Sequence, residues 1–399
     1  MIKLIFLTLF LLPIALFSRS TQPSNVPLPE ITVQNLDPYP CNEACMQKYL
    51  DNGLIFSYLS YTSIEMQSEF LSKEKVYYAP VIKNEPTIKR KKIRIALLMP
   101  YKTIGRYAAS TTNASFAYLI SKESPFELKS YKIEDESYEE IFKALNKIKD
   151  DGFEYVIAPM TQVGEKVISK INPSINIYFP TINKKDTQNS SSYLYYGGID
   201  YRAQIDMLLK FSSSPLVIFY DNSEVAQQLS LYEEFSYKQN AQRSVIKFEI
   251  PQKITNLEKQ IKDNSRISGG SFFLNTPIVK SGMIMSQLTL YDTSVTNILS
   301  TQANYNPLLL SMTQYRDRKE MIIANSITIN DDLLVETNSI LQNDIVYDWI
   351  NYTTTVGMDY FSHLINNEKR SYDIEIKSNQ MIYPIKLFQP SVSRFIPYN

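Results

Sequence analysis

Histidine and cysteine are scarce in this sequence, and the side chains that could act as acids, bases or nucleophiles form no recognisable catalytic group. The 399 residues contain one histidine, His363, which helical spacing places beside the apolar stripe of a late helix. Ser72 and Lys75 match S-x-x-K, but the S-D-N and K-T-G partners of that chemistry are absent. One histidine is too few for an HExxH zinc site, and the chain has no Gly-rich nucleotide motif and no G-x-S-x-G. We therefore expect no enzyme, no catalytic residue, no metal site and no cofactor.

Acidic residues are the remaining candidates for a polar site. Asp200, Asp206 and Asp221 could contribute to a cleft, but nothing pairs them as acid and base. The doublets Glu139-Glu140 and Asp331-Asp332 fall on polar faces or in loops, where solvation explains them.

The only cysteines are Cys41 and Cys45, four residues apart. An isolated pair in an exported protein is typically a disulfide, and this spacing can close if the first helical turn is irregular. A functional thiol pair or two unpaired cysteines are the alternatives. We predict a structural disulfide.

The stretch Glu154–Lys166, EYVIAPMTQVGEK, combines a buried strand with an immediate helix start. Tyr155–Ala158 is apolar and rich in strand-forming residues, and Pro159 ends it because proline has no N–H for the sheet ladder. Thr161 then supplies a hydroxyl where a helix would begin. A strand that turns at once into a helix leaves free N–H groups at the carboxyl edge of a sheet, where open α/β folds bind ligands.

Strand and helix patterns alternate on both sides of this stretch. Apolar runs that read as strands are Ile93–Met99, Glu127–Ile133, Tyr155–Ala158, Ile175–Phe179, Tyr193–Tyr196, Leu216–Tyr220, Val245–Ile250, Ser271–Leu274, Val295–Ser300 and Ile322–Ala324. A long helix is predicted over Asp344–Leu364, followed by strands at Tyr372–Ile376 and Gln380–Phe388. Alternating β and α elements imply parallel sheets with right-handed crossovers, so we expect two doubly wound lobes with a cleft between them.

The N-terminus has the pattern of an export signal. Lys3 precedes the apolar run Leu4–Phe17, which is short for a membrane span, and Ser18 and Ser20 are small residues suited to cleavage. An uncleaved anchor is the alternative. We expect a periplasmic protein secreted through a Sec-type signal peptide, with no membrane span after cleavage.

Charge and composition are those of an ordinary globular protein. Without Met1–Ser20 the chain has 39 basic and 41 acidic side chains, which gives no electrostatic footprint for nucleic acid. The predicted organisation is a signal peptide 1–20, a Pro-rich linker 21–40, a small helical extension with the Cys pair 41–92, an N-lobe 93–214, a C-lobe 215–340, and a return helix with terminal strands 341–399 that complete the N-lobe and hinge.

Several segments resemble a known family. Ala144–Lys166 resembles the helix, strand and G-x-D-x-I-I-G-P-x-T-S turn of type I periplasmic binding proteins, and the start IRIALLMP is similar to the first strand of that family. Leu216–Glu234 looks like the opening of its second lobe. Phe272–Gln314 resembles the penicillin-binding-protein activator branch, the LppC-like proteins. The resemblance implies a bilobed clamshell that holds any ligand between its lobes.

By position, the resemblance also implies which residues would face a ligand. These ligand-binding candidates are Thr161, Gln162, Thr181 and Asn183 from the first lobe, and Tyr220, Asp221 and Asn275 from the second. Ala158 and Gln162 stand where the family has glycine and a hydroxyl residue.

The sequence is compatible with two functions. The first is a non-catalytic periplasmic scaffold or regulator of an envelope machine, in peptidoglycan synthesis or flagellar motor assembly, with other envelope proteins as partners. The alternative is a substrate-binding receptor for an ABC importer of a small polar solute.

Overall fold

The computed structural model describes residues 39–62, 66–78, 91–122, 124–188, 191–239, 244–253 and 256–398, which form two compact units that meet in sequence at residues 90 and 91. The predicted signal peptide and nearly all of the predicted linker lie outside the described residues.

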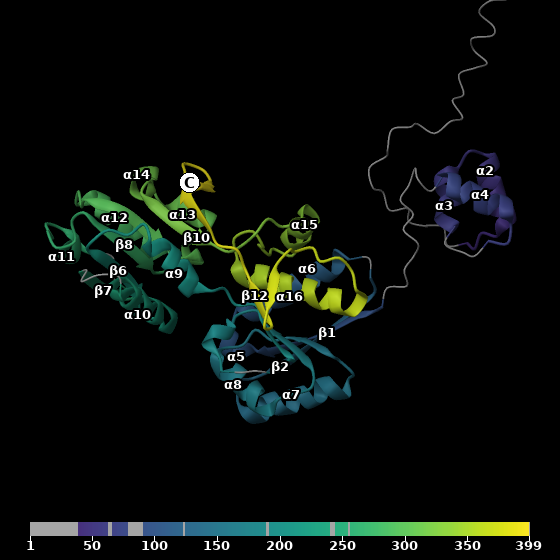
Figure 1. Cartoon of the computed structure of the whole chain (residues 1–399), viewed down its shortest axis with the longest axis horizontal. Helices are drawn as coiled ribbons and strands as arrows, with labels where there is room; N and C mark the ends of the chain where they lie inside the picture. Colours follow the sequence, from purple (N-terminus) through teal and green to yellow (C-terminus); the bar gives the residue numbers. More distant parts are fainter. Residues whose placement is uncertain are drawn as a thin grey trace, which may run out of the picture. The chain divides into compact units, whose positions relative to one another are not determined.

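The first unit is a small bundle of helices (Figure 1). Its helices are α2 (Glu43–Asp51), α3 (Ile55–Tyr61) and α4 (Glu69–Tyr78). Its core comprises the buried residues Cys41, Met46, Tyr58, Leu59, Tyr61 and Leu71. Cys41 and Cys45 form a disulfide at the start of α2, where Asn42 Oδ1 accepts a hydrogen bond from the Cys45 N–H at 3.1 Å. A core this small benefits from the covalent link.

The second unit contains two seven-stranded sheets. The N-lobe sheet has the order β11-β12-β5-β4-β3-β1-β2. Its strands are β1 (Ile93–Pro100), β2 (Phe126–Ile133), β3 (Tyr155–Ile157), β4 (Asn176–Phe179), β5 (Leu194–Tyr196), β11 (Glu375–Lys377) and β12 (Gln380–Ile382). Strands β1 to β5 pair in parallel, as expected for a doubly wound fold.

Helices cover both faces of the N-lobe sheet. The helices of this lobe are α5 (Tyr101–Ile104), α6 (Tyr107–Ile120), α7 (Tyr138–Asp150), α8 (Gln162–Ile171), α15 (Asp332–Ile340) and α16 (Trp349–Asn366), with a 3-10 turn at η2 (Lys184–Asp186). One core joins the sheet to α6 and α16, and the other joins it to α7 and α8. Consequently β1 is buried on both faces from Ile95 onward, and Arg94 is its only charged residue.

The C-lobe repeats this plan with the sheet order β14-β13-β10-β9-β8-β6-β7. Its strands are β6 (Leu216–Asp221), β7 (Val245–Ile250), β8 (Gly270–Asn275), β9 (Val295–Ser300), β10 (Met321–Asn325), β13 (Lys386–Pro390) and β14 (Phe395–Pro397). Its helices are α9 (Tyr201–Leu209), α10 (Glu224–Gln239), α11 (Glu258–Ile261), α12 (Ile278–Leu290), α13 (Pro307–Met312) and α14 (Tyr315–Arg318), with a 3-10 turn at η3 (Gln302–Asn304).

Three segments join the lobes: 197–200, 326–331 and 383–385. The predicted strand Gln380–Phe388 is therefore wrong as one element, because its two halves belong to different sheets. The chain leaves the ladder at Pro384, which has no N–H to donate. In Figure 1 the yellow late segment accordingly appears in both lobes, with α16 and β12 among the N-lobe elements and the chain end in the C-lobe.

Other boundaries also differ from those predicted. The last long helix begins at Trp349 and not at Asp344, because Asp348 caps it by accepting hydrogen bonds from the N–H groups of Ile350 and Asn351 at 2.9 and 3.1 Å. Helix α9 packs against α10 and β10, and α15 packs against α6. Helix α9 therefore belongs to the C-lobe, although the predicted N-lobe included it, and α15 belongs to the N-lobe, although the predicted C-lobe included it. Strands β13 and β14 lie in the C-lobe sheet, whereas the terminal strands were predicted to complete the N-lobe.

A buried tyrosine lies where the joining segments meet the N-lobe. The Tyr178 hydroxyl donates to the Thr353 carbonyl at 2.8 Å and lies 3.4 Å from the Tyr383 hydroxyl. Gly197 and Gly357 flank its ring so closely that a Cβ on either residue would lie 1.9 Å and 2.2 Å, respectively, from the nearest Tyr178 atom. Both positions therefore require glycine.

Candidate functional site

The loops at the carboxyl ends of the parallel strands contain most of the residues predicted to bind a ligand. Thr161 follows β3, and Thr181 and Asn183 follow β4. In the C-lobe, Asp221 ends β6 and Asn275 ends β8. Parallel strands bring these loops to one edge of each sheet, which is where open α/β folds bind ligands.

Thr161 is the N-cap of α8, as its position between strand and helix predicted. Its Oγ1 accepts a hydrogen bond from the Val163 N–H at 3.2 Å. The same hydroxyl donates to Glu136, whose carboxylate also accepts from the N–H groups of Thr161 at 2.7 Å and Gly164 at 3.0 Å. Glu136 is only 7% exposed, so a carboxylate of the protein itself already accepts from the N–H groups of Thr161 and Gly164 at the start of this helix.

Of the other N-lobe candidates, Thr181 and Asn183 are hydrogen-bonded within the lobe, and Gln162 is exposed. The Thr181 hydroxyl donates to the Met160 carbonyl at 2.6 Å. Asn183 is buried, with its amide donating to the Gly198 carbonyl at 2.9 Å and its Oδ1 accepting from the Lys185 N–H at 3.0 Å. Gln162, the first residue of α8, is exposed. Thr181 and Asn183 therefore tie neighbouring loops together.

The C-lobe candidates are also engaged within their own lobe. Asp221 Oδ1 accepts from the N–H and the hydroxyl of Ser223 at 3.0 and 2.6 Å. The Tyr220 ring lies under the Lys247 ammonium, 5.3 Å from its centroid. Asn275 Nδ2 lies 2.8 Å from both carboxyl oxygens of Glu233 on α10.

Glu233 is fully buried, and this burial raises the pKa of its carboxyl well above the ordinary value. The Asn275 hydrogen bond and the Lys247 charge act in the opposite direction but are weaker causes. Asn275 Oδ1 is buried and has no hydrogen-bond partner among the described residues. A protonated Glu233 beside an amide is chemically consistent, since the neutral acid can both donate and accept.

Sequence reasoning missed Glu136, Gly164 and Glu233. Glu136 is 25 residues from Thr161 in sequence, and Glu233 is 42 residues from Asn275. No local spacing indicates either contact. Nothing in the sequence singles out Gly164, and its role follows only from the structure, in which a Cβ at this position would lie 2.8 Å from Glu136 Cδ.

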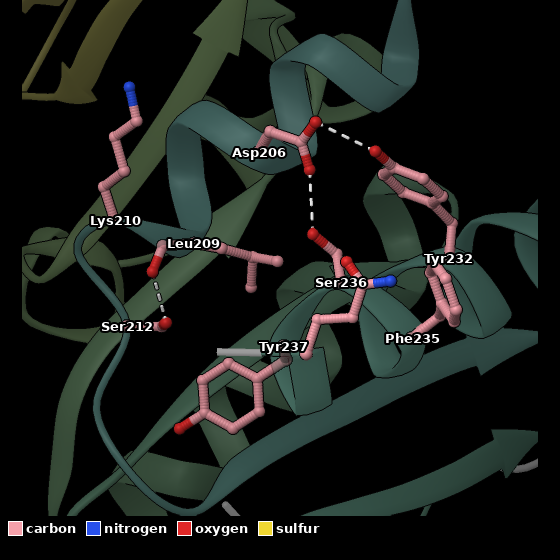
Figure 2. Close-up of a pocket in the computed structure, with 9 residues that line it drawn as sticks. Asp206, Leu209, Lys210, Ser212, Tyr232, Phe235, Ser236 and Tyr237 are labelled. Atoms are coloured by element: carbon pink, nitrogen blue, oxygen red, sulfur yellow. Dashed lines mark hydrogen bonds between the residues drawn. The ribbon is translucent and has the colours of Figure 1, made fainter. Parts of the chain in front are cut away.

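A separate groove of about 620 Å³ lies between α9 and α10 on the flank of the C-lobe. Figure 2 shows Asp206 pointing from α9 toward the hydroxyls of Tyr232 and Ser236 on α10, at 2.8 and 2.9 Å. Burial and the Asp206 carboxylate raise the pKa of Tyr232 to about 12. Asp206, considered from sequence as a cleft residue, therefore links two helices away from the strand ends.

The part of the chain that the structure describes contains no group of three or more His, Cys, Asp or Glu side chains placed to hold a metal ion. None of its helices combines the length and apolar character that a membrane crossing requires.

No family model matches the sequence, and no curated protein matches it in a sequence comparison. Solved structures do match the fold. A protein described as a branched-chain amino acid ABC transporter from Rhodospirillum rubrum aligns with a TM-score of 0.59 at 8% identity, covering 77% of this chain and 100% of its own.

Two further matches contain bound ligands. The substrate-binding protein LivJ from Streptococcus pneumoniae, in complex with isoleucine, aligns with a TM-score of 0.53 at 10% identity over 76% of this chain and 98% of its own. A solute-binding protein from R. palustris, in complex with benzoate, aligns with a TM-score of 0.54 at 10% identity over 77% of this chain and 95% of its own. The likeness establishes the fold: this chain has the two-lobed α/β fold of type I periplasmic binding proteins.

Proposed function

We propose that residues 91–398 act as a non-catalytic solute receptor of the periplasm that delivers a small solute to an ABC importer. The observation that carries this proposal is the pair of mainly parallel sheets, joined by three segments, whose parallel strands bear polar loops at their carboxyl ends. Matching structures of this fold are described as ABC transporter substrate-binding proteins, and they include complexes with isoleucine and benzoate. The predicted export signal is consistent with this location.

Binding in this proposal follows from the hinge geometry. A solute held between the lobes would contact loops of both sheets, so the lobes would approach as the three joining segments adjust. Loop residues whose polar groups are not already hydrogen-bonded within their own lobe, such as the exposed Gln162, would supply polar contacts to the solute. The function would therefore consist of the lobes closing on a solute, and no side chain would need to react with it.

Trp349 offers an intrinsic reporter for this proposal. It is the only tryptophan, and it lies at the start of α16 in the N-lobe with its ring 6.3 Å from that of Tyr201, the first residue of α9 in the C-lobe. Lobe movement should change its surroundings. We would titrate the full chain with amino acids, aromatic carboxylates, amines and wall fragments, measuring Trp349 fluorescence and the melting temperature Tm.

A receptor should give a saturable fluorescence change and a rise in Tm with at least one solute class, because ligand binding stabilises the folded state. A Trp349→Phe variant should keep the Tm response and lose the optical one. A flat response in both measurements across all the solutes would refute the receptor proposal.

A second candidate is the scaffold role in an envelope machine, including the LppC-like relationship suggested by the sequence. It is favoured by the internal engagement of Thr181, Asn183 and Asn275, which leaves few groups for a solute. Exposed apolar side chains on the first unit also suit a protein partner: they are Leu54, Phe56, Phe70, Val76 and Tyr77. Crosslinking in cells should then capture an envelope complex, and recovery of free monomer alone would count against it.

A further inference from the structure

We propose that Glu136 is a built-in occupant of the anion-binding end of α8, so that a solute reaching this part of the N-lobe presents a neutral or cationic group there. This inference rests on the proposed receptor function for its statement about the solute. The occupancy by Glu136 is a property of the N-lobe itself and is tested independently.

The hydrogen bonds show that the end of α8 is occupied. Three donors converge on one carboxylate: the Thr161 N–H at 2.7 Å, the Gly164 N–H at 3.0 Å, and the Thr161 hydroxyl. N–H groups at the start of a helix have no partner within the helix and carry the positive end of its dipole, so they favour an anion. Here the anion is covalently attached to the same chain.

The surrounding atoms fit that carboxylate closely. A Cβ at Gly164 would lie 2.8 Å from Glu136 Cδ and 2.9 Å from the Met160 sulfur, so the acid fills the space that a side chain at Gly164 would need. Glu136 is itself 7% exposed. An external carboxylate or phosphate would therefore have to displace Glu136 before reaching these donors.

Charge around this position also disfavours anions. The loop after β2 and the first turn of α7 carry five acidic residues: Glu134, Asp135, Glu136, Glu139 and Glu140. Lys102 pairs with Glu134 at 2.6 Å, and Asp135 accepts from the Ser137 N–H at 3.0 Å. A Glu136 carboxylate displaced from its three donors would be repelled by the other four acidic residues, and an incoming anion would meet the same repulsion. A solute bearing an ammonium, hydroxyl or amide group avoids both costs.

The test is a chemical rescue in the full chain. Glu136→Ala should leave a small carboxylate-shaped space with its three donors unpaired, which lowers Tm. Sodium acetate or formate should then raise the Tm of E136A in a saturable way, relative to sodium chloride at equal ionic strength. Wild type and Glu139→Ala, which removes an exposed charge from the first turn of α7, should show no acetate-specific rise.

Glu136→Gln covers the case in which E136A does not fold. The amide keeps the shape of the acid but has no charge, and its NH₂ group would face N–H donors with which it cannot form a hydrogen bond. E136Q should therefore have a lower Tm than E139Q. Acetate should not help it, since the space remains filled. Equal stability of E136Q and E139Q, or the absence of acetate-specific rescue in folded E136A, would overturn the proposal.

The two proposals fail in different ways. If acetate rescues E136A but wild type responds to no solute, the occupancy by Glu136 stands and the receptor function falls. If wild type binds a carboxylate solute and E136A binds it no more tightly, the receptor function stands and the stated solute class is wrong. If the receptor and the inference are both correct, wild type responds to neutral or cationic solutes, and E136A gains affinity for carboxylates.

Discussion

The buried Glu233–Asn275 pair makes a measurable prediction about how stability depends on pH. Burial raises the folded pKa of Glu233 above its ordinary value of 4.5, so the folded state holds a proton that the unfolded chain has released. The resulting stabilisation is complete below the unfolded pKa and is lost as the pH rises through the folded pKa. Within that window each pH unit lowers the free energy of unfolding by about 1.4 kcal/mol.

Glu233→Gln should remove this pH dependence. The amide is neutral at every pH and keeps the length needed to reach Asn275, and its NH₂ group can serve the unpaired Asn275 Oδ1. We therefore expect E233Q to unfold at a similar urea concentration to wild type at pH 4.5. The difference in free energy should then move in favour of E233Q by up to about 1.4 kcal/mol per pH unit as the pH rises.

The assay is urea denaturation followed by circular dichroism at pH 4.5, 5.5, 6.5 and 7.5, with the neighbouring Glu234→Gln as control. Glu234 pairs with Lys238 at 2.6 Å and Lys247 at 3.3 Å, and these partners, Lys238 first, lower its pKa. Its stabilisation is present above the unfolded pKa and is lost only as the pH falls through the folded one, so E234Q should not gain on wild type as the pH rises. Parallel pH profiles for wild type and E233Q would refute the reasoning about Glu233.

Two further predictions concern packing and the disulfide. Gly357→Ala should lower Tm, because its Cβ would lie 2.2 Å from Cε1 of the fully buried Tyr178; overpacking of about 1–3 kcal/mol or more exceeds the helix-propensity gain of about 1 kcal/mol. Gly282→Ala, also within a helix but facing only the Thr313 methyl at 3.1 Å, should be nearly neutral, and calorimetry showing equal effects for both would contradict this explanation. Reduction of Cys41–Cys45 should lower the free energy of unfolding of the first unit by about 2 kcal/mol, which is the contribution that loop-closure entropy predicts for so short a loop. Hydrogen exchange of residues 43–62 in the full chain measures this effect, and unchanged protection after reduction would rule it out.

Local patterns were sufficient for much of the fold. The apolar run Ile93–Met99 predicts β1, since a strand buried on both faces needs no polar alternation. The spacing of Tyr138, Ile141, Leu145 and Ile148 predicts α7, whose buried residues include the last three. The alternation of such elements indicated the two doubly wound lobes that the structure contains.

The candidate site was less accessible to sequence reasoning. The capping role of Thr161 follows from a hydroxyl placed between a strand and a helix. The internal partners of the site residues do not follow, because Glu136 and Glu233 approach their partners only when helices pack onto a finished sheet. Likewise, Gln380–Phe388 has strand character throughout, and only the topology divides it between two sheets.

That divided segment has a consequence for the order in which the protein can fold. Strand β12 joins the N-lobe sheet beside β5, and β13 joins the C-lobe sheet beside β10 within a few residues. Both sheets therefore remain incomplete during synthesis until nearly the whole described chain has been made. Because closing such distant contacts is slow, the unfinished edges at β5 and β10 stay available for pairing until the last strands arrive. The two lobes should then be completed together rather than in succession.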